Sequence, residues 1–548
     1  MKRTQLFAKD LIFMTIMNKP QIFINQAGYA PNTDKKAYLP FKADSFTVED
    51  ENGNIVFSGI PSYFGFDEAS GDEVYTADFS ALNEQGRYRV KADEKSSALF
   101  EIGDVYKDVC RDTIRAFYYL RCGCGLDREH AGDYEHKPCH TGDAVLWEDH
   151  SVKKDVTGGW HDAGDYGRYV TAGAVALAHL LYAYKMFPDA YKNIRTNIPD
   201  SCEMPDLLTE CKIELLWIMK MQNEQGGVYH KATTKGHAPF IMPEEDVSQM
   251  YLLPVSSMAA ADTAAVLALA SGIYREFDNS FADELQSCAK RSYSWLEANP
   301  DFIFINPPEC TTGSYGERGD KDNRFWAASE MYALTGEEKY HNDIVRILDE
   351  NIWLTGLGYG DTGGLGSLAY ILSAQKKDDI LLKKILNAYE HRANELASFS
   401  DNCGYGTALR PNEYCWGSNM NVLKAGMTFI IAAEFCGRKE FINYAIRQAD
   451  YILGANPLGI SYLSGTGEYC INFPHLRPAA ADGIEKCHEG MISGGPNRYL
   501  SDPDASKHIP ENTPPMKCFA DVTECYSLNE ITIYWNSPAV FLFGYLSK

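Results

Sequence analysis

The sequence predicts a protein of two domains: a small β-sandwich over residues 20–103 and a large all-α domain over residues 104–548. Residues 1–19 form an N-terminal extension ahead of them. A chain of 548 residues is too long for one ordinary hydrophobic core, so more than one domain is expected. Short runs of β-branched and aromatic residues fill the first part, and apolar residues at helical spacing fill the rest. The pattern changes near Asp104, which sets the predicted boundary.

Seven short strand-like runs occupy the first predicted domain. The dipeptide Asn52-Gly53 lies between two of them and is a strong signal for a hairpin turn. Short strands at this density, about eighty residues for seven strands, are typical of an immunoglobulin-like sandwich. We find no cluster of His, Cys and carboxylates here and interpret the domain as a structural or docking module. The predicted strands cover residues 21–25, 37–41, 45–49, 55–58, 75–79, 86–91 and 97–102.

The second predicted domain is helical throughout. Its longer helices are expected at residues 170–184, 207–222, 259–277, 281–299, 324–334, 380–396, 419–435 and 441–453. Together with shorter candidates, about a dozen helices without intervening strands indicate a closed ring of helix pairs. Loops rich in Gly, Pro, Asn and aromatic residues connect them, and loops gathered at one end of such a ring would form a cleft.

Composition limits the partners. The chain has 51 basic and 75 acidic residues, a net charge of −24 and a pI near 5.0. This charge repels phosphates, so neither nucleic acid nor an anionic membrane is an expected partner, whereas a neutral ligand is compatible. The sequence contains no run of 18 or more apolar residues that would predict a membrane span.

Cysteine usage and the N-terminus favour a cytoplasmic location, with secretion as the alternative. Fifteen scattered cysteines form no repeating framework, which fits a reducing compartment. The apolar run Leu11–Met17 follows Lys9 and Asp10 directly. No small-x-small cleavage site follows it, so it does not read as a secretory signal.

The most informative stretch is residues 158–169, Gly-Gly-Trp-His-Asp-Ala-Gly-Asp-Tyr-Gly-Arg-Tyr. Asp162 and Asp165 stand three residues apart among four glycines, directly ahead of a predicted helix. Glycine lets the backbone turn sharply, so both carboxylates can face one open side. The alternative is that Asp165 caps the helix, because Asp is a favoured N-cap residue.

A second carboxylate cluster lies near the C-terminus. Asp521 and Glu530 are surrounded by aromatic and apolar residues, including Ile531 and Trp535. A partly dehydrated Glu has a raised pKa and can hold a proton near neutral pH. The alternative is a pair of carboxylates on a surface loop.

These two segments resemble glycoside hydrolase family 9, the inverting β-1,4-glucanases. Residues 158–165 match that family's pattern without a gap, and Phe519 through Ser537 meet every specified position of its C-terminal signature. The resemblance implies an immunoglobulin-like module ahead of an (α/α)6 barrel. It also implies site roles: Asp165 as general base, Asp162 sharing the attacking water, Glu530 as general acid, and Asp521 supporting the acid.

Further substrate contacts follow from the same resemblance. The family's third signature ends in His-x-Arg, matched here by His475 and Arg477, which are candidate hydroxyl donors; His475 is also a candidate catalytic residue. The sequence departs from this signature at Tyr469 and Leu476, which leaves the sugar contacts of these loops open. Two aromatic residues are candidates for stacking on glucose rings, with a core role as the alternative: Trp416 and Tyr526.

The resemblance also implies metal sites and no organic cofactor. Two thiols and two imidazoles suit a closed tetrahedral zinc site: Cys122, Cys139, His140 and His161. Their spacing is not that of a zinc finger, and the set is taken from members of the same family branch, with Cys124 as an alternative to Cys122. A calcium site is expected from the oxygen ligands Asp320, Asp322 and Asn323.

The expected activity is inverting hydrolysis of β-1,4-glucosidic bonds in cellodextrins or soluble β-glucans. One alternative keeps the fold and changes the sugar, as an exo-β-glucosaminidase on chitosan oligomers. A second is a non-catalytic carbohydrate-binding protein, which intact Asp162, Asp165 and Glu530 oppose because binding alone needs neither acid nor base. A third is another helical-ring enzyme, such as an epimerase or lyase, which the complete C-terminal signature opposes.

Overall fold

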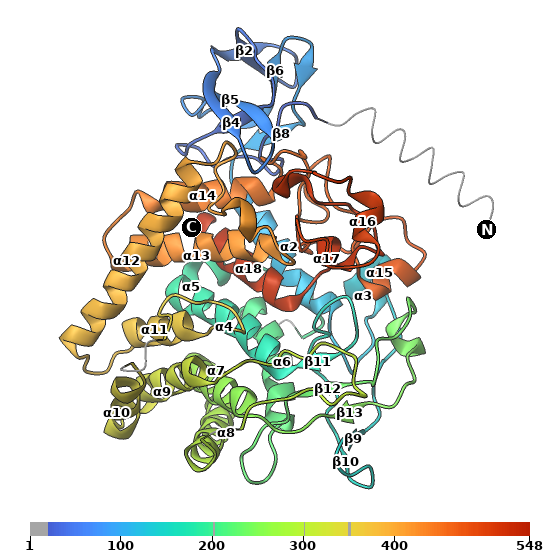
Figure 1. Ribbon diagram of the computed structural model, residues 1–548, viewed down its shortest axis with the longest axis vertical. Helices are drawn as coiled ribbons and strands as arrows, with labels where there is room; N and C mark the ends of the chain where they lie inside the picture. Colours follow the sequence, from blue (N-terminus) through green and yellow to red (C-terminus); the bar gives the residue numbers. More distant parts are fainter. Residues whose placement is uncertain (1–19, 201–202, 301, 349–351) are drawn as a thin grey trace.

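The computed structural model describes residues 20–200, 203–300, 302–348 and 352–548 and has a β domain followed by a helical domain (Figure 1). The predicted N-terminal extension, residues 1–19, lies outside the described residues. The β domain, blue in Figure 1, sits at one end of the helical domain beside α14 (Phe441–Ile452). Most buried apolar residues of the β domain form a core of their own, whereas Phe23, Tyr38 and Val74 belong to the core of the helical domain.

The β domain is a sandwich of two antiparallel sheets, with strand orders β1-β5-β4 and β3-β2-β6-β7, and β8 pairing with β6. The hairpin predicted at Asn52-Gly53 is confirmed, because it joins β2 to β3, and Gly53 has a φ of +83° that favours glycine. The strands are β1 (Lys36–Leu39), β2 (Phe46–Asp50), β3 (Ile55–Gly59), β4 (Ser62–Asp67), β5 (Asp72–Asp78), β6 (Gly86–Ala92), β7 (Lys95–Ser96) and β8 (Phe100–Ile102).

Two parts of the sandwich differ from the prediction. Strand β4 was not expected, because its aromatic residues are exposed and a register shift between Tyr63 and Gly65 disrupts the alternation on which strand prediction depends. The run at residues 21–25 makes only isolated bridges at Ile22 and Phe23 instead of a strand.

The helical domain is an (α/α)6 barrel in which outer and inner helices alternate along the described chain. The inner helices pack on one another in the order α4, α7, α9 and α11, and α13 packs on α18, which packs on α4. The outer helices are α2 (Val105–Tyr119), α6 (Asp206–Lys220), α8 (Asn279–Ala298), α10 (Glu338–Leu348), α12 (Asp379–Asp401) and α14. The inner helices are α4 (Val170–Met186), α7 (Ser257–Tyr274), α9 (Lys321–Thr335), α11 (Gly363–Leu372), α13 (Ser418–Phe435) and α18 (Ile533–Leu546).

The inner helices are rich in small and apolar residues, which explains their burial. Helix α7 contains seven alanine residues over its 18 positions, and the Ser256 side chain caps it by accepting from the Ala259 N–H. This helix is long and apolar enough to cross a membrane, but 89% of it is buried inside the protein, which identifies it as a core helix. The predicted helix at residues 170–184 is confirmed as α4.

The expectation that no strands interrupt the helices is wrong. A five-stranded sheet of order β10-β9-β13-β12-β11 lies within the helical domain. Its strands are too short for any periodic pattern to be read from the sequence. They are β9 (Ala144–Leu146), β10 (Lys153–Lys154), β11 (Arg168–Tyr169), β12 (Lys231–Thr233) and β13 (Tyr251–Leu252). Strand β11 directly precedes α4, so the sheet fixes the end of the segment that carries Asp162 and Asp165.

Short helices complete the loops around the barrel. They are α3 (Arg128–Ala131), α5 (Pro188–Tyr191), α15 (Arg477–Ala481), α16 (Ala505–His508), α17 (Tyr526–Asn529) and four single turns, η1 (Gly132–Tyr134), η2 (Pro243–Glu245), η3 (Pro411–Glu413) and η4 (Pro515–Lys517).

Candidate active site

Residues 158–169 form a turn that leads into α4, and the backbone of this turn is fixed at its start. Gly158 and Gly159 have φ values of +106° and +77°, which favour glycine. The Cys122 N–H donates to the Gly159 carbonyl at 2.8 Å, and the His161 N–H donates to the Leu120 carbonyl at 2.7 Å. The segment that follows α2 therefore holds the backbone just ahead of the two carboxylates.

Asp165 is a buried carboxylate that lines a pocket and receives several donors. Its Oδ2 lies 3.1 Å from the Gly167 N–H, 3.4 Å from the Tyr169 hydroxyl and 3.2 Å from His237 Nδ1. Burial raises its pKa, but the hydrogen bond and charge of His237, together with the Arg477 charge, lower the pKa to about 2. The alternative role as a helix cap is wrong, because Tyr169 occupies the N-cap position of α4.

Asp162 lines the same pocket as Asp165, but its pKa is shifted in the opposite direction. The Tyr315 hydroxyl donates to its Oδ2 at 2.5 Å, while the buried Oδ1 has no partner among the described residues. Burial raises the pKa of Asp162 well above its ordinary value, and the Asp165 charge adds to this shift, although the Tyr315 hydrogen bond opposes it. The unpaired oxygen is free to bind a water or a substrate hydroxyl.

Glu530 lines the same pocket and comes directly after α17. Its main chain is fixed because the Gly494 N–H donates to its carbonyl at 2.8 Å and the His475 N–H donates to the Asn529 carbonyl at 2.9 Å. Burial raises the pKa of Glu530 well above its ordinary value, and the charges of Asp165 and Asp162 raise it further. Arg477 and the Gly164 N–H oppose the shift. Glu530 therefore holds a proton at a pH at which Asp165 is ionised.

Asp521 and His475 lie behind Glu530. Asp521 accepts the N–H groups of Asn472 and Phe473 at 2.7 and 3.0 Å and the Asn529 amide at 2.8 Å. His475 Nδ1 lies 2.7 Å from the Thr523 carbonyl, which can only accept, so this nitrogen carries the proton. The Asp521 side chain therefore joins residues 472–473 to Asn529, which precedes Glu530, and the His475 side chain is fixed by Thr523.

Arg477 contacts the main chain next to Asp165. Its Nη1 donates to the Gly164 carbonyl at 2.5 Å and its Nε donates to the Ala238 carbonyl at 2.7 Å. These contacts join the turn that carries Asp165 to the loop that carries His237. With two of its donors bound to main-chain carbonyls, Arg477 has fewer donors available for sugar hydroxyls than the sequence suggested.

The pocket that contains the three carboxylates has a volume of about 340 Å³ and aromatic walls. Tyr315, Tyr359, Tyr534 and Trp535 line it, together with Trp416. The Trp416 side chain is 43% exposed, which excludes a core role, and its ring centroid lies 5.3 Å from that of Tyr526. Exposed aromatic faces of this kind can stack on sugar rings.

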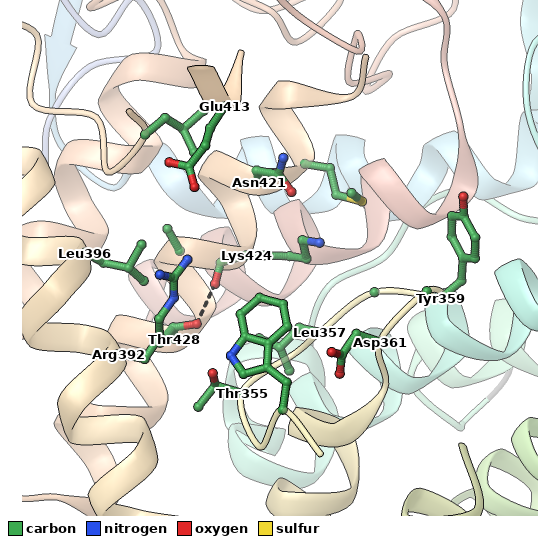
Figure 2. Close-up of a pocket in the computed structure, with 16 residues that line it drawn as sticks. Thr355, Leu357, Tyr359, Asp361, Arg392, Leu396, Glu413, Asn421, Lys424 and Thr428 are labelled. Atoms are coloured by element: carbon green, nitrogen blue, oxygen red, sulfur yellow. Dashed lines mark hydrogen bonds between the residues drawn. The ribbon is translucent and has the colours of Figure 1, made fainter. Parts of the chain in front are cut away.

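A second cavity of about 430 Å³ adjoins the pocket, and Tyr359 and Met420 line both. Figure 2 shows Lys424 extending from α13 across this cavity toward the loop that carries Tyr359 and Asp361. Burial lowers the pKa of Lys424 to about 8, although the Asp361 charge opposes the shift. The exposed Trp353 also lines this cavity. The cavity therefore offers a ligand one aromatic face and several polar groups.

The four predicted zinc ligands lie together. Their ligand atoms are all within 4.8 Å of one another: Cys122, Cys139, His140 and His161. Cys124 does not belong to this group, so the alternative ligand is not supported. His140 Nδ1 and His161 Nε2 lie 3.4 Å apart, and Asp246 lies 3.5 Å from the other nitrogen of His140. A carboxylate behind an imidazole ligand is typical of zinc sites.

Two of the three predicted calcium ligands, Asp320 and Asn323, have different partners. The Asp320 carboxylate pairs with Arg324 at 2.9 Å. Asn323 instead donates to Asp262 at 3.0 Å and lies 3.4 Å from Glu317. Burial and the charges of Asp262 and Asp322 raise the pKa of Glu317 to about 10. Asn323 Oδ1 and Asp262 Oδ2 are buried and have no hydrogen-bond partner among the described residues. Buried oxygens of this kind can serve as ligands of a cation.

Sequence reasoning missed two side chains that contact the carboxylates. Tyr315 has a positive φ of +48° and reaches Asp162 from a loop whose sequence carries no signal for this role. His237 lies in a loop whose sequence gives no sign of a contact with Asp165.

Comparisons with known proteins agree with this geometry. A family model described as "Glycosyl hydrolase family 9" matches residues 106–543, and one described as "Cellulase N-terminal ig-like domain" matches residues 17–97. A cellodextrinase from Butyrivibrio fibrisolvens is 44% identical over 540 residues, which cover 95% of this chain and 98% of that protein. Endoglucanase D from Acetivibrio thermocellus is 33% identical over 533 residues, covering 95% of this chain and 82% of the relative.

Solved structures show the same architecture. A thermostable endoglucanase from Alicyclobacillus acidocaldarius superimposes with a TM-score of 0.91 at 32% identity, covering 97% of this chain and 100% of that one. A Zn-binding triple mutant of the family 9 endoglucanase J30 superimposes with a TM-score of 0.90 at 31% identity, covering 95% and 99% of the two chains.

Proposed function

The chain belongs to glycosyl hydrolase family 9 and is a glycoside hydrolase of β-1,4-glucans; from this premise we propose that it hydrolyses cellodextrins with inversion of configuration. In this proposal Asp165 is the general base and Glu530 is the general acid. Asp162 orients the attacking water, and Asp521 supports the segment next to the acid.

The proposed reaction is a single displacement. The Glu530 carboxyl donates its proton to the glycosidic oxygen as the bond between that oxygen and the anomeric carbon breaks. A water held by Asp165 and Asp162 attacks the anomeric carbon from the opposite face and gives its proton to the Asp165 carboxylate. Exchange with solvent then returns a proton to Glu530 and removes one from Asp165.

One observation carries the assignment of acid and base. Three carboxyl groups share one pocket, and their surroundings shift the pKa values of Asp165 and Glu530 in opposite directions. Hydrogen-bond donors stabilise the ionised form of Asp165, whereas burial and neighbouring negative charge favour the protonated form of Glu530. An inverting glycosidase needs this combination of one carboxylate and one carboxylic acid.

We propose short β-glucan chains as the substrate. The catalytic pocket and the adjoining cavity share Tyr359 and Met420, so a chain of several glucose units can continue from one into the other. The cellodextrinase relative matches over almost its full length, which favours cellodextrins over polymeric cellulose.

Product chromatography tests the substrate class. Cellobiose through cellohexaose and the matching glucosamine oligomers are incubated separately with the enzyme. The proposal predicts release of glucose or short cellodextrins from the first series and no cleavage of the second. Release of glucosamine would support the alternative exo-β-glucosaminidase, and no cleavage of either series would favour a carbohydrate-binding protein.

We also propose a structural zinc ion held by Cys122, Cys139, His140 and His161. Support comes from the donor set, the 4.8 Å limit on ligand separations and Asp246 behind His140. Bound zinc would cross-link the segment after α2 to the turn that carries Asp162. Elemental analysis of the purified protein tests this proposal, with about one zinc per chain as the expected result.

Calcium is a separate proposal with a revised ligand set. The revised ligands are oxygen atoms of three side chains: Glu317, Asp322 and Asn323 through its Oδ1. Asp320 is left out because it pairs with Arg324. Calcium would neutralise the buried negative charge next to α9. A rise in thermal stability on addition of Ca²⁺ to metal-stripped protein supports the proposal, and an unchanged midpoint contradicts it.

We propose a cytoplasmic location for the enzyme. The fourteen described cysteines are free thiols, which suits a reducing compartment. Fractionation of the source cells, with activity on cellobiose and cellotriose as the readout, tests this location.

A further inference from the structure

Trp160, two residues before Asp162, is held by two glutamates that the proposed reaction does not use. Its side chain is fully buried, and its indole N–H donates to Glu210 Oε1 at 2.8 Å. Its main-chain N–H donates to Glu214 Oε2 at 2.7 Å. Glu210 and Glu214 lie one turn apart on α6, so the same face of that helix contacts both ends of the Trp160 residue.

The two glutamates differ in their other contacts. Glu210 forms a buried ion pair with Arg121, whose Nε and Nη2 donate to its two oxygens at 2.8–3.1 Å. Glu214 has no such counter-ion among the described residues, and its described hydrogen bond is the one from Trp160. Glu210 therefore joins α6 to the residues after α2. The hydrogen bond of Glu214 instead reaches the main chain of residues 158–169, which we call the base segment because it carries Asp165.

The neighbouring glycines show that space is reserved for the Glu214 carboxyl. A Cβ at Gly173 of α4 would lie 2.3 Å from Glu214 Oε1, and a Cβ at Gly159 would lie 2.8 Å from Glu214 Oε2. A larger residue at either position would displace the carboxyl from the Trp160 N–H. Helix α4 and the base segment thus meet around this one side chain.

We propose that Glu214 is a positioning residue for hydrolysis: by holding the Trp160 main-chain N–H, it sets the place of Asp162 and of the water that Asp162 shares with Asp165. This inference rests on the proposed roles of those two aspartates. The Asp162 N–H donates to the Gly167 carbonyl at 2.9 Å, and its carbonyl accepts the Ile533 N–H at 2.8 Å. These bonds hold the other side of Asp162, and Trp160 lies two residues before it, so Glu214 completes the support of a carboxylate that must align a water. A displacement of about 1 Å at such a group can cost 10²-fold in rate.

The test compares Glu214→Ala with Glu214→Gln, which keeps a carbonyl acceptor of the same length. Glu330→Ala is the matched control, because Glu330 is also a fully buried glutamate on a barrel helix and accepts from the Tyr182 hydroxyl away from the pocket. For each variant, kcat and KM on cellotetraose, the thermal midpoint and the zinc content are measured.

We expect Glu214→Ala to lower kcat about tenfold or more, with KM and zinc content close to wild type. Glu214→Gln should recover most of that loss, and Glu330→Ala should lower the thermal midpoint without lowering kcat. If Glu214→Ala is insoluble, Glu214→Asp replaces it, since its carboxyl is one methylene too short to reach Trp160.

Three results would overturn the inference: an unchanged kcat in Glu214→Ala, an equal kcat loss in Glu330→Ala, or a kcat loss that follows zinc loss. Asp165→Asn is assayed in parallel. If Asp165→Asn keeps its activity, the proposed function fails, whereas a normal kcat in Glu214→Ala alone contradicts only the role of Glu214.

Discussion

The two sides of the catalytic pocket are built in different ways. The base side is one short segment, residues 158–169, which exchanges main-chain hydrogen bonds with the residues just after α2 and donates the Trp160 N–H to the Glu214 side chain of α6. The acid side combines segments that are distant in sequence, since isolated bridges pair Glu530 with His475 and Ile531 with Ser493. Donors converge on Asp165, whereas Glu530 lies among negative charges.

This difference shows how one pocket can hold a carboxylate and a carboxylic acid together. Hydrogen bonds to Asp165 stabilise its ionised form, and burial of Glu530 near two other acids stabilises its protonated form. Changes on the acid side should therefore alter proton donation to the leaving group, whereas loss of the zinc ligands next to the base side should alter stability first.

Removal of the acid should have the largest effect. Glu530→Gln is expected to lower kcat on cellotetraose by about 10²–10⁴-fold, because general acid catalysis contributes on that order. Aryl cellobiosides with good leaving groups should lose much less, since their leaving groups need little protonation. Equal losses on both substrates would show that Glu530 is not the acid.

The pH profile should separate the two sides. Glu530 must be protonated to act, and its pKa is raised, so activity should persist through neutral pH and fall as the pH rises through that pKa. Asp165 must be ionised, and its pKa of about 2 places its loss of activity at strongly acidic pH. Glu530→Gln should remove the alkaline fall of kcat/KM on an aryl cellobioside. An alkaline fall that remains in this variant would assign it to another group.

Loss of a proposed zinc ligand should lower the stability of the protein first and its activity second. Cys139→Ser is expected to lower the free energy of unfolding by about 4 kcal/mol or more, because loss of a metal site is among the most destabilising effects of a single substitution, with kcat falling as a consequence. Cys436→Ser is the control, because this half-buried thiol lies outside the ligand group. Thermal unfolding and zinc content are measured together, and wild-type stability with zinc lost would contradict a structural role.

The smallest effect is expected from the aromatic wall. Trp416→Ala should raise KM for cellotetraose about 2- to 10-fold with little change in kcat, since an aromatic contact contributes about 0.5–1.5 kcal/mol. Trp353→Ala, in the adjoining cavity, should affect cellohexaose more than cellotriose. If Trp416→Ala leaves KM unchanged for every chain length, Trp416 does not stack on the substrate.

The contiguous parts of the molecule could be predicted from sequence. The segment 158–165, the C-terminal signature and the long helices are local patterns, and the hairpin at Asn52-Gly53 follows from its turn residues. The group of Cys122, Cys139, His140 and His161 was proposed from the family resemblance, and the structure places these residues together.

Features that depend on tertiary contacts could not be predicted. Tyr315 and His237 reach the two aspartates from distant loops, and the Glu214 contact with Trp160 depends on how α6 packs. The five-stranded sheet in the helical domain is made of strands too short to carry a period. Asp320 was taken as a ligand from its neighbours in sequence, but its pairing with Arg324 one helical turn later is a competing local contact.

The most direct test of the account is the anomeric form of the first product. Proton NMR follows hydrolysis of cellotetraose within the first minutes, before mutarotation equilibrates the anomers. If Asp165 activates a water while Glu530 protonates the leaving oxygen from the other face, the α-anomer appears first. The β-anomer appearing first would mean retention through a covalent intermediate, and would contradict the roles assigned to both residues.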